Sequence, residues 1–146
     1  MIDLEKIKNR IEIIRSNVVE LEDMKNLSLE HFSGHKRDVA AAKHFIREAI
    51  EAMIDIGAHI VAKRLFGAPA SAADVMIVLG EKGAIPREHV ETYVRMVKYR
   101  NRLVHFYHEV TIVELHNIIQ NHLQDFEHFI GDIALYLESN HSEEKP

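Results

Sequence analysis

The chain of 146 residues contains no cysteine. Disulfide bonds, thiolate metal sites and a cysteine nucleophile are therefore excluded, and the composition suits a reducing compartment. The sequence also lacks a long apolar run, and charged residues are spread through "IDLEKIKNR" directly after Met1. Because neither a signal peptide nor a membrane-spanning segment is expected, we predict a cytoplasmic protein with no membrane partner.

Glycine and proline are scarce, at six and three residues, and no segment shows sustained alternation of apolar and polar residues. A β-sheet is therefore not expected. Apolar residues instead recur three and four positions apart, which is typical of helices that pack against other helices. We predict an all-α fold, an up-down helical bundle of four long helices plus one short helix, as a single domain over residues 1–146 with a frayed tail from about 139 to 146.

Local signals indicate where these helices begin and end. Gly67 is a candidate C-cap, and Pro86 suits the first turn of a helix. Thr111 and Glu114 have the spacing of a capping box. The predicted helices are residues 4–21, 36–66, a short one from 71 to between 80 and 83, 86–107 and 111–137, with a loop at 27–35.

Several catalytic and ligand-binding motifs are absent. The chain has no glycine-rich phosphate loop, no nucleophile elbow of the GxSxG type and no HExxH zinc motif. Its eleven histidines show no convincing metal pattern, since His116, His122 and His128 are six residues apart and do not share a helix face. We therefore expect no bound metal and no cofactor.

Asp55 and His59 stand four residues apart on the long helix, where a metal site could begin. Asp55 lies among apolar residues, where a carboxylate needs a partner such as a basic residue of the 86–107 helix. An exposed acid on the helix surface explains Asp55 about as well, and both interpretations stay open.

The formal net charge is −5, but the charge is unevenly distributed. Residues 86–107 carry five Lys and Arg against two acids, whereas residues 108–146 carry eight acids against one lysine. A short stretch of that basic segment contains no acid at all, and it is followed by His105 and Tyr107. Its cations are Arg95, Lys98, Arg100 and Arg102. This asymmetry indicates a local anion site in an acidic protein.

Helical geometry limits how this segment can act. Asn101 and His105 are four residues apart and share a face, whereas Arg100 and His105 are separated by about 140° around an ideal helix. Arg100 and Tyr107, seven residues apart, share a neighbouring stripe. Arg100 and His105 can converge on one ligand only if the helix is irregular near its end or if a second subunit completes the pocket.

These residue types suit metal-independent cleavage of a phosphodiester. An arginine can bind a phosphate through two N–H groups, and a histidine can take or give a proton near neutral pH. RNA supplies its own nucleophile, the 2′-hydroxyl. Arg95, Lys98 and Arg102 would attract the phosphates. The alternative is structural, because cations near a helix C-terminus are favoured by the helix dipole, and the pattern alone slightly favours that alternative.

The segment "RNRLVHFY" resembles the signature of the HEPN superfamily (higher eukaryotes and prokaryotes nucleotide-binding), and more narrowly that of HepT-type toxins, Arg-x4-His-x-Tyr. Arg100, Asn101, His105 and Tyr107 fill its positions. The long helix, which reads "AIEAMIDIGAHIVAKR", and the position of the motif late on the penultimate long helix also resemble this family.

The resemblance implies a metal-independent ribonuclease that acts as a homodimer, with two motifs facing one another across a cleft. Arg100 would hold the scissile phosphate, His105 would act as general acid and base, and Asn101 would orient His105 or the phosphate. The implied partner is a minimal nucleotidyltransferase (MNT) antitoxin, which would transfer AMP from ATP to Tyr107. Two other hypotheses remain: a HEPN module that binds a nucleotide or a partner without cleaving RNA, and a plain helical scaffold.

Overall fold

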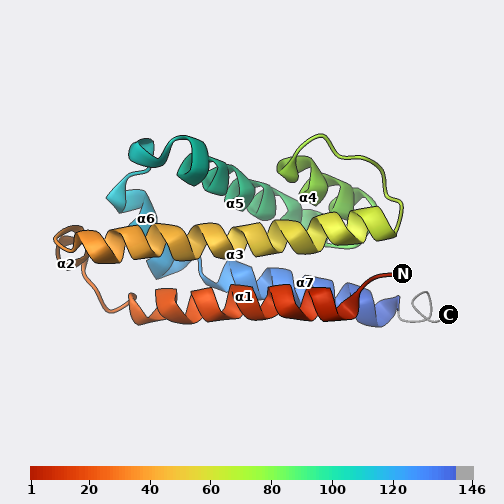
Figure 1. Cartoon of the computed structure of the whole chain (residues 1–146), viewed down its shortest axis with the longest axis horizontal. Helices are drawn as coiled ribbons and strands as arrows, with labels where there is room; N and C mark the ends of the chain where they lie inside the picture. The colour runs from red at the N-terminus through yellow and green to blue at the C-terminus, as the bar shows by residue number, and fades with distance from the viewer. Residues whose placement is uncertain (141–146) are drawn as a thin grey trace.

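The computed structural model of the protein describes residues 1–140, and helices are the only regular secondary structure within that range. Figure 1 shows their arrangement. Their bounds are α1 (Leu4–Asp23), α2 (Leu29–Ser33), α3 (Lys36–Lys63), α4 (Ala72–Glu81), α5 (Arg87–His105), the 3-10 helix η1 (Tyr107–Glu109), α6 (Ile112–Asn121) and α7 (Gln124–Ser139). The predicted all-α bundle is confirmed.

Helix α3 is the centre of the bundle. It runs between α1 and α7 on one side and α4 and α5 on the other, and it contacts α1, α4 and α5 directly (Figure 1). Its buried side chains include Ile46, Met53 and Ile60, each at most 1% exposed. Because α3 is covered on both sides, residues on its opposite faces reach different parts of the molecule.

Several predicted helix ends are confirmed by caps. The Asp3 side chain accepts a hydrogen bond from the Lys6 backbone at the start of α1. Thr111 and Glu114 form the predicted capping box at the start of α6. Such caps satisfy backbone N–H groups that the helix itself cannot.

The end of α3 differs from its prediction. The helix ends at Lys63 rather than at residue 66, and the cap residue is Arg64 rather than Gly67. Leu65 follows in the left-handed region, with φ of 55°, and breaks the helix before the glycine. Gly67 also has a positive φ, 131°, but it lies in the loop beyond.

Two further differences concern short elements. The predicted loop at 27–35 contains α2, which is capped by Ser28 and anchored by the fully buried Phe32. The predicted helix 111–137 is two helices, separated at His122 and Leu123. Leu123 is only 1% exposed, so the apolar pattern continues across the break, and the sequence therefore predicts one helix instead of two.

At the C-terminus, Ser139 still belongs to α7, and residues 141–146 of the predicted tail lie outside the described residues. Among residues 1–140 no helix combines the length and the apolar character needed to cross a membrane.

Candidate active site at the end of helix α5

The Arg-x4-His-x-Tyr motif identified in the sequence spans the end of α5. Helix α5 ends at His105, two residues earlier than predicted, and the Phe106 backbone N–H donates to the Arg102 carbonyl at 2.8 Å. Tyr107 then lies in η1, outside the helix. The prediction that Arg100 and Tyr107 share a helical stripe is therefore wrong, because helical spacing does not extend to Tyr107.

Arg100 points toward α3. Its Nε lies 3.8 Å from Glu51 Oε1, and its Nη1 donates to the Asn101 side-chain oxygen at 2.7 Å. The side chain is 23% exposed, and Nε is buried without a hydrogen bond. Within residues 1–140, Nη2 also makes no hydrogen bond, so this guanidinium keeps donors available for an anion.

His105 and Asn101 are arranged differently. His105 is exposed, and among the described residues its ring makes no hydrogen bond, ion pair or ring contact. Asn101 uses its side-chain oxygen to accept from Arg100. Asn101 therefore positions the guanidinium in this single chain, and its predicted action on His105 stays a prediction.

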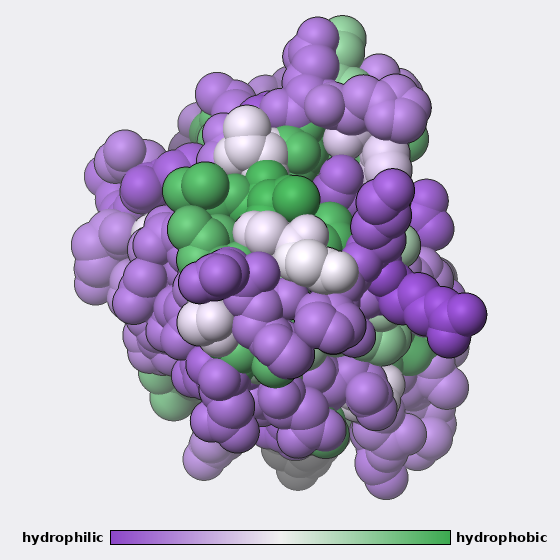
Figure 2. All heavy atoms as spheres, turned by 90° about the vertical axis from the view of Figure 1, so that its left-hand side faces the viewer, coloured by the Kyte–Doolittle hydropathy of each residue, from purple (hydrophilic) through white to green (hydrophobic). Residues whose placement is uncertain are grey.

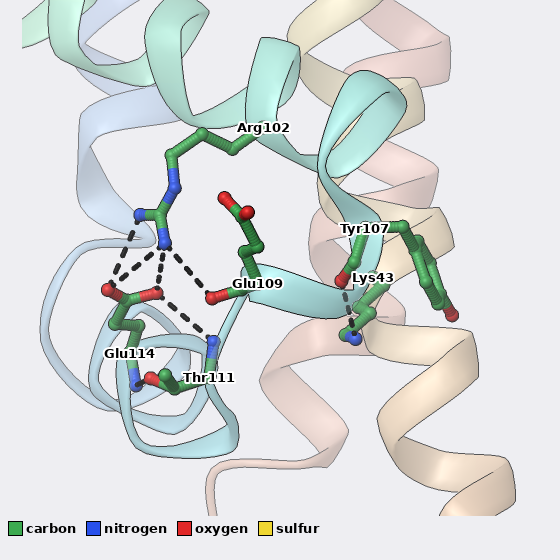
Figure 3. A network of polar contacts seen from close by, with 6 residues as sticks. All are labelled: Lys43, Arg102, Tyr107, Glu109, Thr111 and Glu114. Atoms are coloured by element: carbon green, nitrogen blue, oxygen red, sulfur yellow. Dashed lines mark hydrogen bonds and ion pairs between the residues drawn. The ribbon is translucent and has the colours of Figure 1, made fainter.

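Tyr107 is reached by a lysine from α3. Lys43 Nζ lies 4.0 Å from the centre of the Tyr107 ring and donates to the Tyr107 carbonyl at 3.4 Å. The Tyr107 ring is directed away from the side chain of Arg102, as Figure 3 shows. Because Tyr107 is 41% exposed, its surface is open to a partner protein.

Arg102 is held by α6. It donates to Glu114 at 3.0 Å and to the Glu109 carbonyl at 3.4 Å, and Glu114 also accepts from the Thr111 backbone (Figure 3). Burial alone would raise the pKa of Glu114, but hydrogen bonds from Arg102 and Thr111 lower it below its ordinary value. Much of the Arg102 charge is therefore balanced within the protein, which weakens its predicted role in RNA binding.

The four cations of the basic segment lie on two sides of α5. Arg95, Lys98 and Arg102 line one groove between α5 and α6, whereas Arg100 faces α3. Arg95 is 70% exposed, with only a 3.9 Å contact to Glu91, and Lys98 has no charged partner within residues 1–140. Arg95 and Lys98 are thus the available cations beside the motif, and phosphate binding by them stays a prediction.

Asp55 and His59 lie on the α1 side of α3. Asp55 is 52% exposed and pairs with Arg10 of α1 at 3.1 Å. Of the two open interpretations, the exposed acid on the helix surface is confirmed, and the partner from the 86–107 helix is wrong. His59 Nε2 accepts from the Asp3 backbone at 2.9 Å. Burial lowers the pKa of His59, and Lys6 and Lys63 lower it further. Both residues therefore contribute to the packing of α1 on α3.

No metal centre forms in the described part of the chain. His116 Nε2 donates to the Leu27 carbonyl at 2.9 Å, whereas His122 and His128 flank Asp125 at 3.7 and 3.9 Å. Over residues 1–140 no group of three His, Cys, Asp or Glu side chains could hold an ion.

Sequence reasoning missed Glu51, the acid beside Arg100. Its position on α3 gives one local signal, a helical pair with Arg47 four residues earlier, at 3.9 Å. A better signal is the chemistry of Arg100, because a partly buried guanidinium needs an acid from a neighbouring helix. The 86–107 helix itself provides none near Arg100.

A model of the ribonuclease HepT-like family matches residues 7–133. Two curated relatives agree with it. The chain is 34% identical over 88 residues to an mRNA nuclease HepT of Shewanella oneidensis, and this match covers 60% of the chain and 66% of the relative. It is 25% identical over 131 residues to a tRNA nuclease HepT of Aphanizomenon flos-aquae, covering 90% of the chain and 89% of the relative.

Solved structures show the same likeness. A tri-AMPylated HEPN toxin of Shewanella oneidensis in complex with its MNT antitoxin superposes with a TM-score of 0.82 at 27% identity, covering 89% of this chain and 97% of that one. The match of the family model extends over most of the bundle and includes the whole motif at the end of α5. The chain belongs to the ribonuclease HepT-like family.

Proposed function

We propose that this protein is the ribonuclease toxin of a toxin–antitoxin pair, and that it cleaves RNA without a metal at a site built from Arg100 and His105. One observation carries the proposal. At the end of α5 a guanidinium with unused donors and an unpaired imidazole stand in the Arg-x4-His-x-Tyr pattern. A buried donor without a partner, such as Arg100 Nε, is expected at a functional site rather than at a structural one.

The proposed chemistry needs only these two groups and the RNA. His105 takes the proton of the 2′-hydroxyl, the 2′-oxygen attacks the phosphorus, and the bond to the 5′-oxygen breaks. The imidazolium then returns the proton to the leaving 5′-oxygen, which leaves a cyclic phosphate and a 5′-hydroxyl. Arg100 stabilises the charge that develops on the phosphate oxygens, and this type of stabilisation is often the largest contribution to catalysis.

A second copy of the chain would complete the site. Arg100 faces α3 and His105 is exposed at the helix end, so one chain does not direct both at one phosphate by helical geometry. Apolar residues gather on the end of the molecule where α5 ends and α6 begins (Figure 2). Val104, Phe106 and Val113 of this region are 41, 55 and 62% exposed. A twofold dimer would cover them and place each His105 near the Arg100 of the other copy.

The antitoxin would act on Tyr107. The Shewanella relative is tri-AMPylated in its complex with an MNT antitoxin, which supports an equivalent partner for this chain. Tyr107 is exposed, and Lys43 lies over its ring, so phosphates added there would meet a cation. The added negative charge would also repel RNA from the same surface.

The direct test is RNA cleavage by the purified protein in the presence of EDTA. Arg100→Ala and His105→Ala should each lower cleavage at least about a hundredfold. The matched controls, Arg37→Ala and His44→Ala, remove an exposed arginine and an exposed histidine and should cleave like the wild type. Binding of RNA or of a nucleotide without any cleavage would instead favour a non-catalytic HEPN module.

Modification is tested separately by intact mass after co-expression with the nucleotidyltransferase. We expect a gain of one or more AMP groups and the loss of RNA cleavage. Tyr107→Phe should show neither change, because its ring lacks the accepting oxygen. An AMP gain that persists in Tyr107→Phe would place the modification on another residue.

A further inference from the structure

A groove of about 610 Å³ opens between α5 and α6, beside the candidate site but on another face of α5 than Arg100. Its apolar surface comes from side chains such as Ile46 of α3, Met96 of α5 and Ile118 of α6. Its volume falls within the range of about 300–1,000 Å³ that is usual for small-molecule sites. The groove is therefore large enough for a nucleoside.

Within residues 1–140, one polar group in this groove is buried and unsatisfied, and a second polar side chain lies exposed at its edge. The Tyr99 hydroxyl is buried and makes no hydrogen bond. Burial, followed by the charge of Glu114, raises the pKa of Tyr99 well above its usual range, so the hydroxyl stays a neutral donor. A buried hydroxyl without a partner costs stability, so a ligand that satisfies Tyr99 would be favoured. Asn117 is exposed and accepts from Asn121 through its oxygen, which leaves its amide NH₂ free to donate to a ligand in place of water.

The charges around the groove suit a strand with phosphates outside and a base inside. Arg95 and Lys98 are exposed at its α5 side, and within residues 1–140 the only acid contact of the pair is the one of Arg95 with Glu91 at 3.9 Å. Arg102 is paired with Glu114, and Asp125 stands on the far side with His122 at 3.7 Å. A carboxylate at that position disfavours a phosphate deep in the groove, but it can accept from an amino group of a base.

The groove also leads to the motif. Lys98, Arg102 and His105 lie four and three residues apart, so they form one stripe along α5. Tyr99 precedes His105 by six residues, which is about 9 Å along the helix axis. That separation corresponds to a nucleotide next to the linkage on which His105 would act.

We propose that this groove binds one base of the RNA strand, at a nucleotide adjacent to the cleaved linkage, with Arg95 and Lys98 contacting the flanking phosphates. The inference rests on the proposed function and adds to it the origin of base preference. Apolar walls bind the face of a base without regard to its identity, whereas Tyr99, Asn117 and Asp125 can distinguish its edges.

Tyr99→Phe tests the orphan hydroxyl. The fold should be retained, because the hydroxyl has no protein partner to lose. Mapping the ends of the RNA fragments should show that preference for the favoured base falls by about three- to tenfold, the range expected for one neutral hydrogen bond. Cleavage next to the favoured base should fall, whereas cleavage next to the other bases should change less, since Arg100 and His105 are untouched.

Asn117→Trp tests the space itself, because a large ring would fill the groove. Its control is Asn26→Trp, at an exposed position that does not line the groove. We expect KM for RNA to rise about tenfold in Asn117→Trp and to stay unchanged in Asn26→Trp. Nucleoside monophosphates titrated onto His105→Ala should shift NMR signals saturably, and Asn117→Trp in the same background should remove that binding.

Three results would overturn the inference. Wild-type cleavage together with unchanged KM and base preference in both variants would remove the base site and leave the proposed function standing. Loss of antitoxin binding in Asn117→Trp, with RNA cleavage unaffected, would make the groove a protein-docking site. Failure of the wild-type protein to cleave any RNA would remove the proposed function and this inference together.

Discussion

The polar side chains at the two ends of helix α5 differ in their hydrogen bonding. Near its start, His89 Nδ1 donates to Asp132 of α7 at 2.8 Å, and the Tyr93 hydroxyl donates to the same carboxylate oxygen. At its end, Arg100 leaves donors unused and His105 has no partner within residues 1–140. One helix therefore carries a satisfied network at its start, whereas its end carries a guanidinium with unused donors and an exposed imidazole without a protein partner in the described part of the chain.

The difference teaches how to separate structural from functional polar residues. The Asp132 side chain is 12% exposed and Tyr93 is 1% exposed, and both are hydrogen-bonded, so this network stabilises the packing of α5 on α7. Burial, with the hydrogen bond to Asp132, raises the pKa of Tyr93 and keeps it neutral. Nothing comparable stabilises His105.

The variants His105→Ala and His89→Ala should differ most clearly, because the first should lose RNA cleavage and the second should lose stability. Cleavage should fall by about 10²–10⁴-fold in His105→Ala, the usual contribution of a general acid–base. The free energy of unfolding should change by less than about 0.5 kcal/mol, as for other exposed positions. His89→Ala should keep the wild-type cleavage rate and lower the stability instead. RNA cleavage and urea denaturation of both variants would check this, and equal activity loss in both would break the comparison.

Asp132→Ala should cause the largest loss of stability, about 2–3 kcal/mol, because it leaves the buried Tyr93 hydroxyl without an acceptor. Asp132→Asn keeps an oxygen acceptor and should lose less. Urea denaturation of the two variants measures both effects. Asp132→Ala as stable as the wild type would show that the network does not hold α5 on α7.

Glu51→Gln should lower RNA cleavage about tenfold, a loss of about 1.4 kcal/mol in transition-state stabilisation, because Arg100 would lose its charged partner and its orientation. Glu51→Ala should lower it further. Glu48→Gln is the control, since Glu48 pairs with His44 on the same helix and not with Arg100. Steady-state kinetics should show the effect mainly in kcat/KM, and an unchanged value would deny Glu51 a positioning role.

The smallest effect concerns pH. The hydrogen bond to Asp132 raises the pKa of His89 above its ordinary value of 6.5. The stabilisation from protonated His89 is therefore fully present below about pH 6.5 and is lost as the pH rises through the raised pKa. Because the His89 side chain is 39% exposed, solvent screening keeps this contribution below about 1 kcal/mol. Unfolding measured from pH 5 to 9 should show this decline, and His89→Gln should remove it.

Much of the fold was predictable because apolar spacing and caps are local. The spacing predicted the helices, and the Thr111–Glu114 box marked the start of α6 correctly. The break between α6 and α7 at His122 and Leu123 was not predicted. Leu123 is buried, so the apolar spacing looks the same for one continuous helix as for two. The early end of α3 escaped because it depends on a left-handed Leu65, a residue type that rarely adopts that conformation.

The residues of the candidate site could be predicted from the sequence, but the directions in which their side chains point and the partners they contact could not. The motif identified Arg100, Asn101, His105 and Tyr107, yet the partners Glu51 and Lys43 come from α3, far away in the sequence. The division of the cations between two sides of α5 also depends on contacts with α3 and α6. Such contacts are tertiary, and no local pattern encodes them.

The composite nature of the site is the central claim, and a mixed dimer tests it most directly. Arg100→Ala and His105→Ala copies would be co-expressed with different tags, and the dimer carrying one of each would be purified. If Arg100 of one copy works with His105 of the other, one of its two sites is intact, and the mixed dimer should cleave RNA at about half the wild-type rate. Both parent variants should be inactive. A mixed dimer as inactive as its parents, or a wild-type protein that cleaves RNA as a monomer, would contradict the account.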